Sequence, residues 1–412
     1  MVPSGSIGLA LWFLIFFSLS LTNPLEARGH FGRLAGKPPQ RTASDGICAS
    51  SVHIFGYKCE EHDVVTQDGY ILNMQRIPEG RTGAGNPAKR QPVLIQHGIL
   101  VDGISWLLNP ADQNLPLILA DQGFDVWMGN TRGTRFSKRH KYLNANQPAF
   151  WNWTWDELVS YDLPAMFDHI HGLTGQKIHY LGHSLGTLIG FTSFSEKGLV
   201  DKLKSAAMLS PIAYLSHMTT VLVDIAARSF LAEAIAIIGL AEFNPKSGIV
   251  GKLIKGICHD ANIDCYDLLA VITGKNCCLN ASTIDLFLAN EPQSTSTKNM
   301  IHLSQTVRDK VLRKYNYGSS DRNMKHYGQA LPPVYNISAI PHDLPLFFSY
   351  GGLDRLADVT DVKYLLDQFK FHNSDKMDVQ FVKEYAHADF IMAVNAKDVV
   401  YNQVVTFFKR QA

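Results

Sequence analysis

The stretch Ile178-His-Tyr-Leu-Gly182-His-Ser184-Leu-Gly186 decides how the chain folds. An apolar, strand-like run leads into the pattern Gly-x-Ser-x-Gly, and the helix-prone residues 187–196 follow it. A serine at a tight strand-to-helix turn adopts strained backbone angles, and the small residues Gly182 and Gly186 let neighbouring segments approach closely. Such a turn lifts the hydroxyl into a pocket and aims the amino end of the helix at developing negative charge. We therefore predict that Ser184 is a nucleophile.

Strand and helix signals alternate on both sides of this turn. Short apolar, β-branched or aromatic runs are separated by helical stretches, which is typical of a mostly parallel sheet with helices on both faces. The predicted strands lie at residues 62–65, 70–76, 93–96, 124–128, 178–181, 206–209, 346–349 and 379–382. A Gly-x-Ser-x-Gly turn after one of these strands predicts the α/β-hydrolase fold.

Residues 212–343 interrupt the alternation, because their patterns are mostly helical. We expect them to form a cap or lid, inserted into a hydrolase core made of residues 45–211 and 344–412. The first part of the insertion, residues 213–243, is apolar with scattered charges. It could lie against a pocket mouth or a lipid surface, or form buried helices.

A serine hydroxyl becomes a strong nucleophile only when a histidine removes its proton, and a carboxylate must orient that histidine. In this fold both residues follow the serine in the chain, the acid first. Asp354 follows the predicted strand at 346–349 after two glycines, and His387 follows the last predicted strand. We predict a catalytic triad of Ser184, Asp354 and His387.

Other residues remain candidates for these two roles. Asp358 and Asp361 lie further into the next predicted helix, where acids ordinarily serve as caps or dipole partners. His372 is the main rival of His387, although it follows a helical stretch instead of a strand.

An oxyanion hole needs two backbone N–H donors, one from the residue after the nucleophile and one from a loop after an earlier strand. Leu185 takes the first role, and Ile99 in the sequence His97-Gly98-Ile99 is the predicted second donor. His97 precedes the serine in the chain, so we expect it to make a structural hydrogen bond. His183 is discounted as the base, because adjacent side chains at such a turn point apart.

The amino-terminal sequence predicts export. An apolar run at residues 7–17 is too short to span a bilayer comfortably, and Pro24 and Ala27 follow it at the distance of a cleavage region. We expect a signal peptide of residues 1–27, with a retained anchor as the alternative. Glycosylation sequons that support the secretory pathway stand at Asn152, Asn280 and Asn336.

The six cysteines are even in number, which fits disulfides in an oxidising compartment and leaves fifteen full pairings open. Zinc is the alternative use of such residues. The gap between Cys258 and Cys265 and the adjacent pair Cys277-Cys278 match no ordinary zinc spacing, so no metal site is predicted.

Composition excludes several classes of protein. With 412 residues, 46% of them hydrophobic and 18% charged, the chain can bury a sizeable core and is not of the disordered class. The formal net charge is +1, and no basic stripe carries interleaved aromatic residues. Nucleic acid is therefore not an expected partner.

Six blocks of the sequence, in this order along the chain, resemble the acid lipase family. This family contains the gastric and lysosomal acid lipases, and the resemblance is closest to its plant triacylglycerol lipases. The blocks are Val65-Thr-Gln-Asp-Gly-Tyr-Ile-Leu72, Gln96-His-Gly-Ile99, Gly129-Asn-Thr-Arg-Gly-Thr134, Gly182-His-Ser-Leu-Gly186, Tyr350-Gly-Gly-Leu-Asp354 and His387-Ala-Asp-Phe390. Together they cover nearly the whole chain after the predicted signal peptide.

The resemblance implies hydrolysis of long-chain acylglycerols or steryl esters by the predicted triad, with Ile99 and Leu185 as the hole and a helical cap over the site. It implies a neutral lipid partner at an oil–water or membrane interface, and no cofactor or metal. Mammalian members usually carry glutamine where this chain has Leu185. Because the hole uses the backbone amide, the chemistry is expected to survive this difference, whereas packing under the lid and substrate preference can change.

Alternatives to a triacylglycerol lipase are open on the same scaffold. Within enzymes these are a steryl ester hydrolase, a small-ester esterase and an acyltransferase. Outside enzymes, the fold could serve as a lipid carrier or ligand receptor with an idle triad, which the intact triad positions disfavour. Secretion and delivery to a vacuole or lysosome share the same signal.

Overall fold

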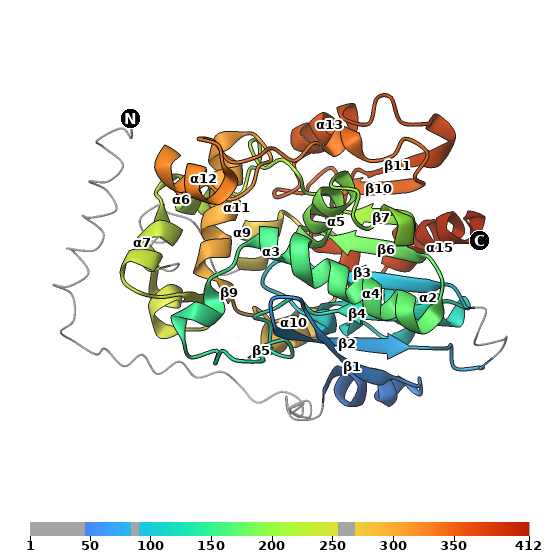
Figure 1. Cartoon of the computed structure of the whole chain (residues 1–412). Helices are drawn as coiled ribbons and strands as arrows, with labels where there is room; N and C mark the ends of the chain where they lie inside the picture. Colours follow the sequence, from blue (N-terminus) through green and yellow to red (C-terminus); the bar gives the residue numbers. More distant parts are fainter. Residues whose placement is uncertain (1–45, 84–89, 254–267, 412) are drawn as a thin grey trace.

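The computed structural model describes residues 46–83, 90–253 and 268–411 (Figure 1). The predicted signal peptide, Cys258 and Cys265 lie outside these residues. None of the helices in the described ranges is both long enough and apolar enough to cross a bilayer.

A mostly parallel sheet forms the centre of the fold. Its strand order is β1-β2-β4-β3-β6-β7-β10-β11, and β5 pairs with β2. The first two strands are antiparallel, β2 is antiparallel to β4, and the strands from β4 to β11 run parallel to one another. The strands are β1 (Glu60–Val65), β2 (Tyr70–Ile77), β3 (Pro92–Gln96), β4 (Asp125–Gly129), β5 (Arg139–His140), β6 (Ile178–His183), β7 (Leu203–Leu209), β10 (Leu346–Gly351) and β11 (Met377–Val382). Every strand predicted from the sequence is present, and the α/β-hydrolase fold is confirmed.

Helices cover both faces of the sheet. On one face lie α4 (Leu163–Thr174), α5 (Leu185–Ser195) and α13 (Val359–Asp367), and on the other lie α2 (Leu115–Asp121) and α15 (Asn402–Arg410). Successive strand residues serve alternate faces: Leu94 packs in the first layer, and Val93 and Ile95 pack in the second. Because both faces of the inner strands are buried, β3 and β10 are almost entirely apolar.

Short helical turns connect these elements. They are η2 (Cys48–Val52), η3 (His53–Phe55), η5 (Gly103–Leu107), η6 (Ala111–Gln113), η7 (Pro148–Trp151), α3 (Trp155–Glu157), η8 (Leu158–Asp162), η9 (Val200–Lys202), η10 (Ile337–Ala339), η11 (Ser374–Lys376), α14 (Asp389–Met392) and η12 (Lys397–Tyr401). The three sequon asparagines are exposed; they are Asn152, Asn280 and Asn336.

Residues 212–343, here named the cap segment, connect β7 to β10. Their described part gathers beside the central sheet, at the left of Figure 1. Its helices are α6 (Val221–Arg228), α7 (Leu231–Ile237), α9 (Leu268–Thr273), α10 (Ala281–Asn290), α11 (Thr297–Asp309) and α12 (Ser320–Tyr327). An antiparallel pair, β8 (Glu242–Phe243) with β9 (Thr295–Ser296), joins two parts of the segment.

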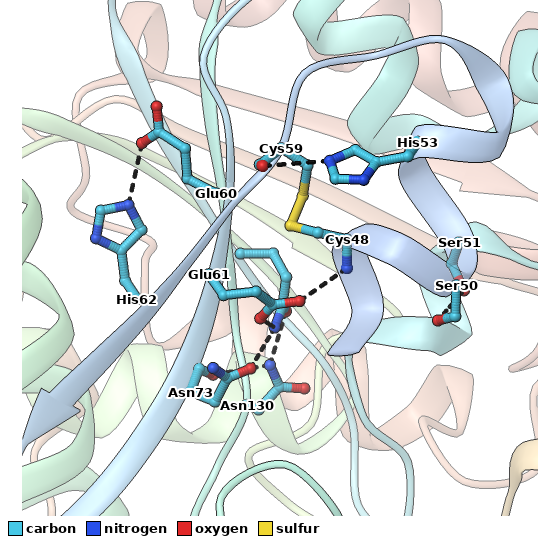
Figure 2. Close-up of a disulfide and its surroundings, with 11 residues drawn as sticks. Cys48, Ser50, Ser51, His53, Cys59, Glu60, Glu61, His62, Asn73 and Asn130 are labelled. Carbon is cyan, nitrogen blue, oxygen red and sulfur yellow. Dashed lines mark hydrogen bonds and ion pairs between the residues drawn. A yellow bond between two sulfur atoms is a disulfide. The ribbon is translucent and has the colours of Figure 1, made fainter. Parts of the chain in front are cut away.

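Two disulfides join neighbouring parts of the described chain, Cys48 to Cys59 and Cys277 to Cys278. Figure 2 shows the first of them beside β1, where the amide of Cys48 donates to Glu61 Oε1 at 2.8 Å. Glu61 Oε2 in turn accepts from Gln75 Nε2 at 2.7 Å.

The polar network continues from Gln75 into the core. Gln75 Oε1 accepts from Asn130 Nδ2 at 2.9 Å, and Asn130 Oδ1 accepts from the amide of Gly103 at 2.8 Å. Gly103 begins η5, directly after the loop that follows β3. The amino-terminal disulfide region is therefore connected by partly and fully buried hydrogen bonds to a loop at the carboxyl edge of the sheet.

A buried arginine ties three parts of the core together. The Arg132 side chain is 0% exposed and donates to Asp162 Oδ1 at 2.7 Å and to both oxygens of Asp68 at 2.6 and 2.9 Å. Its guanidinium lies 3.9 Å from the centroid of the Tyr70 ring. Burying a charge is costly unless partners satisfy it, and here two carboxylates and an aromatic face do so.

We expect Arg132→Leu to lower the free energy of unfolding by about 3–5 kcal/mol, because it leaves the Asp162 carboxylate buried without its partner. Denaturation in urea measures this loss. The matched control is Arg139→Leu, whose ion pair with Asp63 is half exposed on both sides and should cost less than about 1 kcal/mol. Equal losses of unfolding free energy in the two variants would show that the buried ion pairs of Arg132 stabilise the fold no more than the exposed pair of Arg139 does.

Candidate active site

Ser184 occupies a strained turn between β6 and α5. Its backbone angles are φ 55° and ψ −121°, which a residue with a side chain rarely adopts, and the residue is 3% exposed. A Cβ added at Gly186 would lie 2.5 Å from the Gln96 carbonyl oxygen, and one added at Gly182 would lie 2.8 Å from the carbonyl carbon of Gly186. Only glycine fits at both positions, which supports the predicted elbow.

Asp354 and His387 come together at the carboxyl edge of the sheet, in the loops that follow β10 and β11. His387 Nδ1 lies 2.9 Å from Asp354 Oδ2 and 3.1 Å from Oδ1. Both side chains are buried. His387 Nε2, the other ring nitrogen, is also buried and has no hydrogen-bond partner within the described ranges, so it is free to receive a proton.

The surroundings of Asp354 keep it ionised. Burial alone would raise its pKa, but the adjacent His387 and the amides of Leu356 and Ala357, at 2.9 and 2.8 Å, outweigh burial and lower the pKa. A fixed carboxylate in this place orients the imidazole and stabilises the imidazolium that forms when His387 takes a proton.

His183 connects the nucleophile turn to the histidine loop. Its Nε2 donates to the His387 carbonyl oxygen at 3.0 Å, and the two rings lie 4.8 Å apart. Burial and the neighbouring His387 lower the pKa of His183 to about 3, so the ring is neutral. His183 therefore supports the backbone of His387, a role that the sequence reasoning missed.

The loop after β3 runs beside the nucleophile. A Cβ added at Gly98, the residue before Ile99, would lie 3.0 Å from Ser184 Cβ, so this part of the loop lies against the nucleophile turn. His97 donates through Nδ1 to the Gly98 carbonyl at 2.7 Å and accepts at Nε2 from the amide of Thr131 at 3.1 Å. His97 thus has the structural role expected of it.

Known proteins share this architecture and sequence. A family model described as "alpha/beta hydrolase fold" matches residues 91–392, and one described as "partial alpha/beta-hydrolase lipase region" matches residues 48–110. Triacylglycerol lipase 2 of Arabidopsis thaliana is 85% identical, covering 100% of this chain and 99% of the relative. The human lysosomal acid lipase/cholesteryl ester hydrolase is 35% identical, covering 94% of this chain and 96% of the relative.

The chain belongs to the acid lipase family. The resemblance seen in the six sequence blocks is thereby confirmed, and with it the class of carboxylic ester hydrolase. Among solved structures, a soluble variant of the monoglyceride lipase from Saccharomyces cerevisiae superposes with a TM-score of 0.52 at 12% identity. It covers 84% of this chain and 96% of that one, and it shows that the fold is shared.

The rival acids of this acid lipase family member have structural roles. Asp358 caps α13 by accepting from the amide of Thr360 at 2.8 Å. Asp361 accepts from the amide of His217 at 2.8 Å. Asp358 thus has the cap role expected of it, whereas Asp361 also contacts the ring of His217, with Nδ1 at 2.7 Å, and so connects α13 to the cap segment.

The rival base lies at the wrong edge of the sheet. His372 Nε2 donates to the carbonyl oxygen of Leu344 at 2.8 Å, and Leu344 precedes the amino end of β10. Asp354 follows the opposite end of the same strand. His372 and Asp354 therefore lie at opposite ends of β10, so His372 cannot contact this acid as His387 does.

Within the described ranges, one group of potential metal ligands lies close to His387 in the chain. Cys277, Cys278 and Asp389 are close enough to share an ion, but the two sulfurs are joined in a disulfide. Asp389 accepts hydrogen bonds from both cysteine amides at 3.2 Å. In this oxidised form the group holds the backbone instead of offering thiolates.

The cap segment also holds the loop after β3. The amide of Gln293 donates to the Leu100 carbonyl at 2.7 Å, and Glu291 Oε1 accepts from the amide of Asp102 at 3.1 Å. Glu291 is fully buried, and burial together with the charge of Asp102 raises its pKa to about 8. Sequence reasoning missed Glu291, because nothing in its neighbours marks it as buried.

The raised pKa of Glu291 predicts that stability falls as pH rises. The folded protein keeps this proton to a higher pH than the unfolded chain does, so folding is weakened between the unfolded pKa of about 4.5 and the folded pKa of about 8. In Glu291→Gln the new side chain still offers an oxygen to the amide of Asp102, but it cannot ionise. The melting temperature of the variant should therefore decline less than that of the wild type between pH 5 and pH 8.

Thermal unfolding across this pH range tests the prediction. The exposed Glu384→Gln is the matched control and should follow the wild type. Parallel curves for Glu291→Gln and the wild type would rule out a buried proton at Glu291.

Proposed function

We propose that this member of the acid lipase family is a secreted serine lipase that hydrolyses esters of long-chain fatty acids, with triacylglycerol as substrate. The observation that carries the proposal is the buried His387–Asp354 pair beside the strained Ser184 turn. Such an arrangement suits acyl transfer, because the acid orients a base whose second nitrogen is unoccupied.

The proposed reaction proceeds through an acyl-enzyme. Ser184 Oγ attacks the ester carbonyl carbon while His387 Nε2 takes the hydroxyl proton, and the imidazolium then gives that proton to the departing alcohol oxygen. A water molecule, deprotonated by the same nitrogen, then attacks the acyl carbon. The bond between that carbon and Ser184 Oγ breaks, His387 returns the proton to Ser184 Oγ, and the fatty acid leaves. The amides of Ile99 and Leu185 stabilise the negative oxygen; the Leu185 N–H begins α5 and has no partner within the helix. No step uses a cofactor or metal.

The apolar surroundings favour a long acyl chain. Leu100, next to the predicted hole residue, packs with Ile235, Phe243 and Val250 of the cap segment. Leu185 belongs to a different apolar cluster, which includes Met218 of the cap segment. Each methylene buried on such a surface contributes about 0.8 kcal/mol.

The alcohol part of the ester is assigned from the relatives. The relative at 85% identity is named a triacylglycerol lipase, whereas the human relative is also named a cholesteryl ester hydrolase. The much higher identity supports triacylglycerol as the first substrate. Steryl ester hydrolysis is the second candidate, since the name of the human relative includes both acid lipase and cholesteryl ester hydrolase.

We also propose that the protein enters the secretory pathway and carries glycans. The exposure of the three sequon asparagines supports modification at Asn152, Asn280 and Asn336. The lysosomal relative supports either secretion or delivery to a vacuole or lysosome.

Fatty-acid release from emulsified long-chain triacylglycerol should depend on Ser184. We expect Ser184→Ala to lower release by about 10⁴-fold or more without changing the melting temperature, since the nucleophile is lost and the fold is kept. Titration of released acid measures the rate, with a short-chain soluble ester as comparison. Activity confined to the soluble ester would indicate an esterase. If neither substrate is turned over in a Ser184-dependent way, the acyltransferase and lipid carrier hypotheses are favoured.

The acid assignment has its own test. Asp354→Asn should lower kcat by about 10⁴-fold, because the amide no longer holds the required tautomer of His387. Asp358→Asn is the matched control and should leave kcat within about twofold, as it changes only a helix cap. A larger loss of kcat in Asp358→Asn than in Asp354→Asn would show that Asp358, and not Asp354, is the acid of the triad.

A further inference from the structure

The backbone of the histidine loop is held at three consecutive amides. The amide of Ala386 donates to Asp389 Oδ2 at 2.8 Å, that of His387 to the Thr273 carbonyl at 3.1 Å, and that of Ala388 to Asn276 Oδ1 at 3.2 Å. Two of these acceptors belong to the cap segment. The loop that carries the proposed base is therefore anchored largely by residues from outside the hydrolase core.

Asp389 joins the two sides of this contact. It is fully buried, and its carboxylate accepts from the amide of Ala386 in its own loop and from the amides of Cys277 and Cys278 in the cap segment, both at 3.2 Å. Two carboxylate oxygens can accept three N–H groups, whereas an amide side chain would turn one N–H₂ group towards these donors. The position thus requires a carboxylate.

Asn276 performs the complementary task from the cap segment. While its Oδ1 accepts from Ala388, its Nδ2 donates to Thr273 Oγ1 at 2.8 Å and to the Gly274 carbonyl at 3.1 Å. These donations fix the turn that presents the Thr273 carbonyl.

The Thr273 carbonyl serves both members of the acid–base pair. It accepts from the amide of His387 at 3.1 Å and from the amide of Arg355 at 3.4 Å, and Arg355 directly follows Asp354. A single cap carbonyl therefore sets the distance between the histidine loop and the aspartate loop. A shift of this turn moves the two loops relative to each other.

We propose that Asp389 and Asn276 are positioning residues for the hydrolysis reaction, which hold His387 in register with Asp354 and Ser184 through the cap turn Thr273–Cys278. The inference rests on the proposed function. Neither side chain contacts the reacting atoms. Their effect is transmitted through the backbone of residues 386–388, and a misplacement of about 1 Å at a catalytic group can cost about 100-fold in rate.

The test measures kcat per active site in Asp389→Asn and Asn276→Ala. The number of competent sites is counted by complete labelling of Ser184 with a phosphonate ester, and turnover is measured on a short-chain soluble ester. Loss of folded protein lowers the count of sites but not the turnover of each one. We expect kcat per site to fall by about 10- to 100-fold in both variants, with KM within about threefold of the wild type.

Asn109→Ala is the matched control. Asn109 is a buried asparagine that also links the cap segment to the core: it accepts from Thr283 Oγ1 at 2.8 Å and donates to the Met392 carbonyl at 3.2 Å. It makes no contact with the amides of residues 386–388. We expect a lower melting temperature with an unchanged kcat per site.

Two results would overturn the inference. The first is a kcat per site within about twofold of the wild type in Asn276→Ala; this variant removes no charge, and it tests the inference even if Asp389→Asn does not fold. If Asp389→Asn alone lost activity, the loss would be assigned to its charge. The second is a loss in Asn109→Ala equal to that in the two test variants. Absence of Ser184-dependent turnover in the wild type would instead contradict the proposed function itself.

Discussion

The contact between His387 Nδ1 and the Asp354 carboxylate is the interaction on which the rest of the site depends. A fully buried carboxylate stays ionised only if nearby groups replace the water that it has lost. Here the imidazole and the amides of Leu356 and Ala357 replace it. The pair can form because β10 and β11 are adjacent and parallel, so their carboxyl ends deliver both loops to one edge.

The features of the fold that could be predicted from the sequence are those that depend on residue type along a short stretch of chain. Alternation of apolar strands and helices places the sheet, and the glycines at 182 and 186 mark a close approach that no other residue permits. The element before each histidine, a strand before His387 and a helical stretch before His372, separates the two in the sequence, and the structure places them at opposite edges of the sheet. The roles of Ser184, Asp354 and His387 stay predictions, although the geometry supports them.

The parts that the sequence could not reveal depend on contacts between distant backbone groups. The carbonyl of Thr273 accepts from the amide of His387, and a backbone group carries no signal of residue type. Glu291 looks like an ordinary surface acid until the fold buries it. Asp389 lies within the His387-Ala-Asp-Phe390 block, yet only the structure connects its carboxylate to the cap segment.

The cap segment therefore holds loops of the hydrolase core on two sides. On one side its Gln293 and Glu291 hold the loop that carries Ile99 and Asp102, and on the other its Thr273 and neighbouring turn hold the histidine and aspartate loops. Such hydrogen bonds are short and directional, so the loops cannot keep their geometry if the segment moves as a whole. The helices α6 and α7 do not contribute to these hydrogen bonds, and they are held instead by α11, where Arg308 donates to the Ala227 carbonyl and to Glu233. The cap segment is thus connected both to the core loops and, through α11, to its own apolar helices.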